Sequence, residues 1–558
     1  MNDFERKLRE TPLRQPPAQL RDEILGMPAA EPVAGNNQSA RTSSETSPQR
    51  WFGEADESRA RGKARPLLGV LLKPSSIFCI FIATVMTGAT ALFVGANSAG
   101  KSSWERYSDE ARARGVKMSL KDLLPAPIPD AENFAAVPLF ANLFSEDEAV
   151  RKMAGDALAC GFPEQPKDAR STAMGAPRYS LSDWQTFFVK SGDISTATAD
   201  PAADVLRALE HRFGPHLAEL AEAERRPHAV FPVKWELGFM AGLPHLSVIQ
   251  SAAKIHRIRL AAYLAQGNTA EALAELRGML RLYRALEKEP TMISGLVRVS
   301  VLKLAVSEVW EGVVTAAWDA AALEKIEDDL AGFNLLADCQ LAFASERAGI
   351  NDALESALSG QLPFTGAEMG FGQDPGRQML LRAIPKIPGW ISLNQIAMNR
   401  FHDQAAARID AAAGRFYDTG EIDAQLQEID RSIVKQHIYV LYRVMAPVVA
   451  HAERNFLYTH TALHLATLAC ALERRRLAEG AYSETLAGLV PRYLSALPHD
   501  VMNGEPLHYR RTADGKFLLY SVALNGIDDG GAIGEKEGVT AQLDWAWRWP
   551  DATDQPRK

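Results

Sequence analysis

Cysteine is scarce in this chain of 558 residues, which contains only four. Cys79 falls in an apolar run, and Cys160, Cys339 and Cys470 are far apart, with no CxxC pair. Three cysteines cannot all pair with one another, and a cysteine metal site needs closely spaced thiolates. The sequence therefore supports neither a disulfide framework nor a cysteine metal site.

Positive charge is also in short supply. The chain carries 61 Lys and Arg residues against 69 Asp and Glu residues, which gives a formal net charge of −8. Proteins that bind nucleic acid usually present a field of basic side chains, because phosphate contacts release counterions. We therefore expect no nucleic-acid partner.

Catalytic signatures are missing as well: we identify no GxSxG nucleophile elbow and no phosphate-cradling glycine loop in the sequence. His460 and His464 lie four residues apart on a predicted helix, as two zinc ligands often do. The residues between them include no glutamate for a zinc protease, and no third ligand is in view. We interpret the pair as ordinary surface or core histidines, and nothing else in the sequence favours an enzyme.

The most prominent feature that is present is the uncharged run from Ile77 to Gly95, IFCIFIATVMTGATALFVG. At a helical rise of ~1.5 Å per residue this run spans roughly 28 Å, the thickness of a bilayer core. We therefore predict a transmembrane helix over residues 75–97, with a buried helix of a soluble core as the alternative. A slight excess of basic residues before the run predicts a single-pass protein of the inner (plasma) membrane, with a cytoplasmic N-terminus and an extracytoplasmic C-terminal domain.

Small side chains recur at every fourth residue of this run, at Ala83, Thr87, Ala91 and Gly95. Such a stripe lets a second helix approach closely, so it predicts a homodimer within the membrane. The alternative is that small residues are common in any membrane helix.

The segment before the run, residues 1–70, is rich in Pro, Gly, Ser and charge. Such a composition buries too little apolar surface to offset the entropy of ordering, so we predict a disordered cytoplasmic segment with a short N-terminal helix. Its opening string, NDFERKLRETPLRQPPAQLRDEIL, resembles the start of small single-pass proteins from Verrucomicrobia-like bacteria. Some of those proteins look like membrane partners of sigma factors, which implies a cytoplasmic signalling partner.

Alanine and leucine recur at three- and four-residue spacing through most of residues 133–450, a pattern typical of amphipathic helices. We predict helices over residues 181–189, 202–224, 246–286, 293–317, 320–331, 335–358, 390–414 and 422–443. The unit around Tyr263, Gly267, Ala272 and Met279 resembles a tetratricopeptide hairpin. A solenoid needs about three such repeats, so an ordinary helix-turn-helix pair is the alternative.

The C-terminal part, residues 451–549, differs from the rest in its pattern of predicted secondary structure. A strong helix over residues 451–478 is followed by PLHYRR and KFLLYSVAL, two runs of strand character joined by Thr512 to Gly515. A turn with Asp-Gly between such runs indicates a β-hairpin. We predict a small α+β module with a short antiparallel sheet.

Within this module a series of residues resembles the globular domain of the type II secretion major pseudopilin. The series is Tyr482, Leu497-Pro498 with Asp500, Pro506, Tyr509, Tyr520-Ser521, Asn525-Gly526 and Asp528-Asp529-Gly530-Gly531. That family holds a calcium ion in the loop after its last tyrosine-serine strand. A similar tail occurs in uncharacterised envelope proteins of Planctomycetes and Verrucomicrobia.

The resemblance implies that Asn525, Asp528, Asp529 and Asp544 bind calcium, and their closely spaced oxygens suit that ion. Asn-Gly and Asp-Gly turns, which need no ion, are the alternative. The sequence has no prepilin-peptidase motif before the apolar run, and Val501-Met502 replaces the usual proline-tryptophan. The chain is therefore not itself a pilin.

Together these features predict a mainly α fold: a single transmembrane helix, a helical bundle or hairpin array, and a small α+β module. The predicted segments are 1–70, 75–97, a juxtamembrane helix and Pro-rich spacer at 98–132, 133–450, 451–549 and a tail at 550–558. We expect a membrane-anchored interaction or scaffold protein of the bacterial cell envelope with protein partners. Two alternatives stay open: an envelope hydrolase with a cleft near residues 360–389, which are rich in Gly and Pro, and a transmembrane signalling protein.

Overall fold

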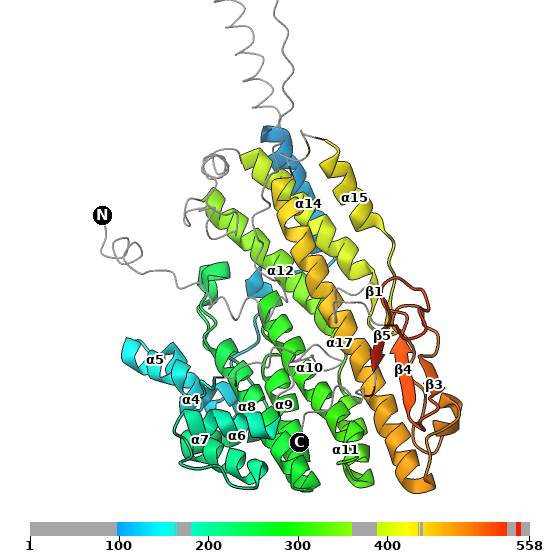
Figure 1. Ribbon diagram of the computed structural model, residues 1–558. Coiled ribbons are helices and arrows are strands. Elements are labelled where there is room, and N and C mark those ends of the chain that lie inside the picture. Colours follow the sequence, from blue (N-terminus) through cyan, green and yellow to red (C-terminus); the bar gives the residue numbers. More distant parts are fainter. Residues whose placement is uncertain are drawn as a thin grey trace, which may run out of the picture. The chain divides into compact units, whose positions relative to one another are not determined.

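The computed structural model describes residues 97–161, 163, 180–359, 388–432, 435, 439–532, 543–547 and 549. The chain divides into two compact units, Met1–Ser98 and Ala99–Lys558. Because nearly all of the first unit lies outside the described residues, the fold described below is that of the second unit (Figure 1).

Helices dominate the second unit, so the predicted mainly α fold is confirmed. The first α-helix ends at residue 113. The α-helices that follow are α4 (Pro138–Ala141), α5 (Glu148–Asp156), α6 (Leu181–Lys190), α7 (Pro201–Arg225), α8 (His245–Ala265), α9 (Thr269–Ala285), α10 (Met292–Val314), α11 (Ala320–Leu330), α12 (Leu335–Leu358), α14 (Pro388–Ala407), α15 (Glu421–Asp430) and α17 (Val440–Glu479). Short 3-10 turns are η1 (Leu120–Asp122), η2 (Asp130–Glu132), η3 (Phe134–Ala136), η4 (Asn142–Phe144), η5 (Trp235–Met240) and η7 (Leu486–Leu489).

Helices α8 and α9 form a hairpin around Gly267, whose φ of 72° lies in the left-handed region that glycine adopts without strain. The side chain of Asn268 then caps α9 by accepting a hydrogen bond from the backbone N–H of Glu271 at 3.3 Å. This is the helix-turn-helix pair that the sequence predicts. Helix α7 packs against α8, and α10 packs against both members of the hairpin.

Helix α10 lies at the centre and packs against α8, α9, α12 and α17. Two glycines allow the closest approaches. A Cβ on Gly295 would lie 3.1 Å from the ring of Phe456 in α17, and a Cβ on Gly312 would collide with the indole of Trp318. That indole donates to the carbonyl of Val309 at 3.2 Å, so it is fixed over the end of α10.

Helices α12 and α14 meet through buried amides. Asn351 and Asn399 exchange side-chain hydrogen bonds of 3.2 and 2.7 Å, and Asn351 also donates to the carbonyl of Met118 at 3.2 Å. The next residue of α12, Asp352, accepts from the backbone N–H of Leu120 at 2.9 Å. These bonds satisfy polar groups that would otherwise be costly to bury, and they fix the segment before η1 on α12.

The C-terminal sheet is antiparallel, in the order β3 (His508–Arg511), β4 (Phe517–Ser521) and β5 (Trp545–Trp547). Gly515, with a φ of 79°, lies in the turn that joins β3 to β4, so the predicted hairpin is confirmed. The sheet lies beside the C-terminal half of α17 (Figure 1). Trp310 of α10 contacts Trp547 at a ring distance of 4.9 Å, and this third strand was not predicted.

Several helix limits near residues 400–450 differ from the predictions. The helix expected to reach residue 414 ends at Ala407 and gives way to a hairpin of β1 (Ile409–Asp410) and β2 (Arg415–Phe416). The backbone N–H of Phe416 donates to the carbonyl of Val501 at 3.0 Å, so a tertiary contact outweighs local helix propensity. The helix predicted over residues 422–443 is not continuous: α15 ends at Asp430, and α17 begins at Val440 and continues through Pro447. The domain boundary predicted at residue 450 therefore falls within α17.

The membrane prediction needs correction. Among the described residues, no helix is both long enough and apolar enough to cross a bilayer. Even the largely buried α10 carries Arg298, Lys303, Glu308 and Glu311 along its length. This finding contradicts the predicted single-pass topology and inner-membrane localisation, and neither enters the proposals below.

Several predictions fall on residues that the structure does not describe. They are the apolar run at 77–95 with its small-residue stripe at Ala83, Thr87, Ala91 and Gly95, the disordered segment at 1–70, the tail at 550–558, and residues 360–387 of the glycine-rich stretch. The last two residues of that stretch, 388 and 389, begin α14.

Candidate functional site

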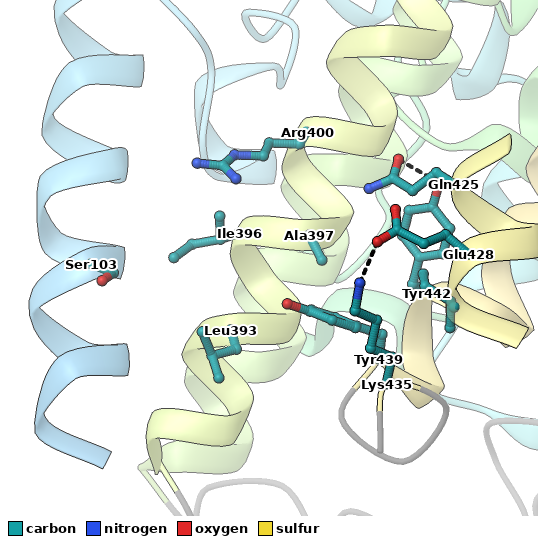
Figure 2. Close-up of a pocket in the computed structure, with 11 residues that line it drawn as sticks. Ser103, Leu393, Ile396, Ala397, Arg400, Gln425, Glu428, Lys435, Tyr439 and Tyr442 are labelled. Atoms are coloured by element: carbon teal, nitrogen blue, oxygen red, sulfur yellow. Dashed lines mark hydrogen bonds and ion pairs between the residues drawn. The ribbon is translucent and has the colours of Figure 1, made fainter. Parts of the chain in front are cut away.

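A cavity of about 330 Å³ lies where α14 meets the helix that ends at residue 113, α15 and α17 (Figure 2). Its apolar lining consists of Leu393, Ile396 and Ala397 of α14 and Ile429 of α15. Its polar lining consists of Ser103, Arg400, Gln425, Glu428, Lys435, Tyr439 and Tyr442. The volume is at the lower end of the range for small-ligand pockets. Seven of the eleven lining residues are polar, so the cavity combines an apolar wall with a largely polar border.

Helical spacing explains why α14 contributes one stripe to the cavity. Leu393, Ile396, Ala397 and Arg400 follow the i, i+3, i+4, i+7 pattern that places side chains on one face. The remaining faces of α14 are buried against its neighbours, α12 and α17 among them. Figure 2 shows Ile396 and Arg400 extending toward the helix that carries Ser103, while Ala397 faces α15.

The first helix approaches α14 through two glycines. A Cβ on Gly100 would lie 2.5 Å from the carbonyl oxygen of Gly389 and 2.8 Å from its Cα. Because both partners are backbone atoms, neither can move aside without displacing a helix. This close approach positions Ser103, three residues later, at the edge of the cavity.

Two polar contacts fix the side of the cavity formed by α15 and α17. Lys435 forms an ion pair with Glu428, and this pairing lowers the pKa of the Glu428 carboxyl. The hydroxyl of Tyr442 donates to Oε1 of Gln425 at 3.0 Å. Burial, and then the negative charge of Asp423, raise the pKa of Tyr442 to about 12, so this phenol remains a hydrogen-bond donor at neutral pH.

Arg400 differs from the other charged residues of the cavity. Its side chain is exposed, and no hydrogen bond or ion pair joins its guanidinium to any residue that the structure describes. The cavity therefore presents one uncompensated positive charge beside an apolar wall. The eleven lining residues include one carboxylate and one serine, and none of the eleven is a histidine. This arrangement suits binding better than acid-base or nucleophilic chemistry.

The four predicted calcium ligands do lie in one region, after β4 and before β5. Asn525 donates to Asp529 at 2.9 Å, Asp528 accepts from Tyr520 at 3.0 Å, and Asp544 accepts from the backbone N–H of Gly531 at 2.7 Å. Within the described residues, however, no group of three or more His, Cys, Asp or Glu side chains is arranged to hold a metal ion. The calcium site stays a prediction.

Asp544 is the most unusual member of this loop. It is only 1% exposed, and its Oδ1 accepts no hydrogen bond from any residue that the structure describes. Burial, together with the charges of Asp529 and Asp528, raises its pKa, although the bond from Gly531 acts in the opposite direction. A bound cation would stabilise the negative charge of this buried carboxylate, which makes Asp544 the residue of the loop with most to gain from an ion.

His460 and His464 also lie together, with a ring distance of 4.6 Å, and His499 lies 6.1 Å from His464. Burial lowers the pKa of His464 to about 4 and lowers that of His460 as well. Nδ1 of His464 lies 3.0 Å from the carbonyl oxygen of His499. Burial thus favours the neutral form of both histidines, and Nδ1 of His460 has no hydrogen-bond partner among the described residues.

The expectation that the sequence has no glycine-loop motif for phosphate needs correction. Residues 95–102, GANSAGKS, match the P-loop pattern GxxxxGK[ST]. A P-loop cradles phosphate with the free backbone N–H groups of a glycine-rich loop between a strand and a helix. Residues 97–102 are instead helical, and Gly100 faces Gly389. In its described part, residues 97–102, the string is therefore helix and not the loop with free backbone N–H groups that phosphate binding needs.

The cavity residues on α15 and α17 were not predicted from the sequence, because no local pattern relates them to α14. Only the stripe on α14 was visible in principle. No protein family model, no curated protein and no solved structure matches this chain. The resemblances to pseudopilins, to tetratricopeptide hairpins and to small single-pass bacterial proteins therefore stay predictions.

Proposed function

We propose that this protein is a non-enzymatic interaction protein, and that its partner inserts an apolar group into the cavity beside α14. The observation that carries this proposal is the lining itself. An apolar wall of Leu393, Ile396, Ala397 and Ile429 is bordered by tyrosine and arginine, the residue types that dominate binding energy at interfaces. Stable helices on all sides provide the framework that keeps such a site open.

The test uses the purified full chain and N-phenyl-1-naphthylamine, an uncharged dye that fluoresces in apolar sites. We expect saturable binding with one site per chain and recovery of the dye unchanged. Ala397→Trp should fill the cavity and reduce the affinity at least about tenfold, because its indole occupies space between α14 and α15. The matched control is Ala221→Trp, which places the same side chain at an exposed position of α7.

The thermal midpoint of each variant is measured in parallel, so that loss of binding is separated from loss of folding. The proposal fails if the dye does not saturate, or if Ala397→Trp and Ala221→Trp bind it equally well while Ala397→Trp keeps the fold. It also fails if the bound probe, or a panel of ester analogues of it, is converted at a rate that Ala397→Trp abolishes.

A further inference from the structure

The charges of the cavity beside α14 do not cancel. Lys435 and Glu428 pair with each other, with side chains 43% and 66% exposed. Arg400 has no such partner among the described residues, although it lines the same space. The cavity therefore holds a net charge of about one positive unit, and a ligand that supplies a negative charge would complete it.

The hydrogen-bonding groups of the cavity show the same imbalance. Oε1 of Gln425 is already engaged by the hydroxyl of Tyr442, so the side-chain amide of Gln425 offers chiefly its N–H donors. The guanidinium of Arg400 can only donate. On the accepting side, the Glu428 carboxylate is already paired with Lys435. The N–H groups of Gln425 and Arg400 are thus available to a ligand that accepts hydrogen bonds.

The apolar residues determine the rest of the ligand. Leu393, Ile396 and Ala397 form a continuous stripe on α14, and Arg400 lies one helical turn beyond it. Figure 2 shows Ile396 and Arg400 extending to the same side of α14. A charged end held by Arg400 would therefore leave the attached apolar body against Ile396 and Leu393.

We infer that the cavity takes an amphipathic carboxylate, with its apolar body on the α14 stripe and its carboxylate on the guanidinium of Arg400. This inference rests on the proposed function and adds the chemical class of the inserted group. A planar guanidinium donates two parallel hydrogen bonds to a carboxylate, which an ammonium cannot do. The same chemistry has two sources: a free aliphatic acid, or the C-terminal carboxylate of a peptide that ends in apolar residues.

The experiment compares ligands of the same length and different charge on the full chain, by displacement of N-phenyl-1-naphthylamine. The first arm uses decanoate, decanol and decyltrimethylammonium below their micelle concentrations. The second arm uses acetyl-Leu-Leu-Phe with a free carboxyl end and the same peptide as its amide. We expect the acid in the operative arm to bind about tenfold more tightly than its neutral counterpart, in keeping with one charge-assisted pair.

Variants assign that preference to one residue. Arg400→Gln should abolish the preference for the acid and leave the affinity for the neutral ligand within about twofold, whereas Arg400→Lys should retain part of the preference. The matched control is Arg225→Gln, which neutralises an exposed arginine of α7. Because Arg400 is exposed and makes no internal bond in the described chain, neither variant is expected to disturb the fold.

Each outcome decides the inference. A preference for the acid that disappears in Arg400→Gln and persists in Arg225→Gln supports it, and the arm in which it occurs identifies the source. Equal affinity for acid and neutral ligand, tighter binding of the cation, or a preference that survives Arg400→Gln overturns it while leaving the proposed function intact. Failure of every probe, the dye included, refutes the proposed function itself.

Discussion

Two regions of this molecule bury ionisable side chains in opposite ways. Between α7, α8 and α9, the two ring nitrogens of His256 lie 2.8 Å from Glu224 and 2.7 Å from Glu275. Arg259 donates to the other oxygen of Glu275 at 2.7 Å. Burial alone would lower the pKa of His256, but the two carboxylates outweigh it and raise the pKa to about 10. The ionisable groups of this region therefore stay charged, and each lies beside an opposite charge.

Around α17 and the C-terminal sheet, three buried groups have no counter-charge among the described residues. Burial lowers the pKa of His460 and His464, and their ionisable neighbours are other imidazoles. Burial also raises the pKa of Asp544, whose charged neighbours are acidic. These groups are driven toward their neutral forms. Burial alone therefore favours the neutral form of an ionisable group, whereas burial beside an opposite charge keeps the group charged.

The largest expected effect comes from removing the histidine of the paired region. His256→Leu would leave the half-buried Glu224 and the buried Glu275 close together and without their common partner. Loss of one member of a buried charge network typically costs about 3–5 kcal/mol, so we expect the free energy of unfolding in urea to fall by about that amount. His464→Leu, measured in the same way near neutral pH, should lose only about 1 kcal/mol, for its single hydrogen bond. Similar losses in the two variants would contradict the comparison.

The second prediction concerns pH. His464 has a folded-state pKa of about 4, below the ordinary value of about 6.5, so the unfolded chain takes up its proton first as the pH falls. Its contribution to stability is therefore present above pH ~6.5 and is lost as the pH falls toward 4. His256 has a raised pKa, so its contribution is present below pH ~6.5 and is lost as the pH rises through about 10.

The two pH dependences are tested by comparing the free energy of unfolding of each histidine variant with that of the parent chain. The free energy of unfolding of His464→Gln, relative to the parent chain, should improve by about 1–2 kcal/mol between about pH 8 and about pH 5. The corresponding difference for His256→Gln should improve in the opposite direction, as the pH rises from about 7 to about 9.5. Differences are needed because other buried groups, such as Glu453 with its pKa raised to about 7 by burial, also titrate in this range. Slopes of the same sign for both histidines would refute the assignment.

A third prediction tests how tightly the charged region is packed. A Cβ on Gly278 of α9 would lie 2.6 Å from Cε1 of His256, and hydrogen bonds on both sides hold that ring in place. Gly278→Ala should therefore destabilise the fold by about 1–3 kcal/mol, despite the higher helix propensity of alanine. Gly155→Ala in α5 is the matched control, because its Cβ meets nothing within 4 Å. The control should stabilise by up to about 1 kcal/mol; a gain in both variants would show that the ring can move aside.

Much of the fold could be predicted from the sequence because its causes are local. The three- and four-residue spacing of apolar side chains gave α6 at 181–190 and α12 at 335–358, and Gly267 and Gly515 marked turns that need a positive φ. Where a distant contact decided the outcome, the prediction was wrong. The hairpin that replaces the end of the helix predicted to reach residue 414 depends on a backbone bond between Phe416 and Val501.

The candidate site could not be predicted because it depends on contacts between distant segments. Ser103, Arg400 and Tyr442 come together only through helix packing, and no spacing in the sequence predicts that they are close. The same holds for Glu224, His256 and Glu275. Residues 95–102 show the converse: their pattern is local, but residues 97–102, the part of it that the structure describes, are helical. Helix periodicity is thus a safer guide than a short motif without its structural context.

The smallest expected effect comes from supplying the unpaired region with a counter-charge. If the acidic loop after β4 binds calcium, the ion should stabilise the buried negative charge of Asp544, as His256 stabilises that of Glu275. About 5 mM calcium should then raise the thermal midpoint of the full chain by about 2 °C. Asp544→Asn should remove this shift, since it abolishes the charge while keeping the shape of the side chain. Asp514→Asn, at the exposed turn between β3 and β4, should leave the shift unchanged. If sodium chloride of equal ionic strength produces the same shift, the effect is screening, and the loop is a set of turns whose aspartates need no ion.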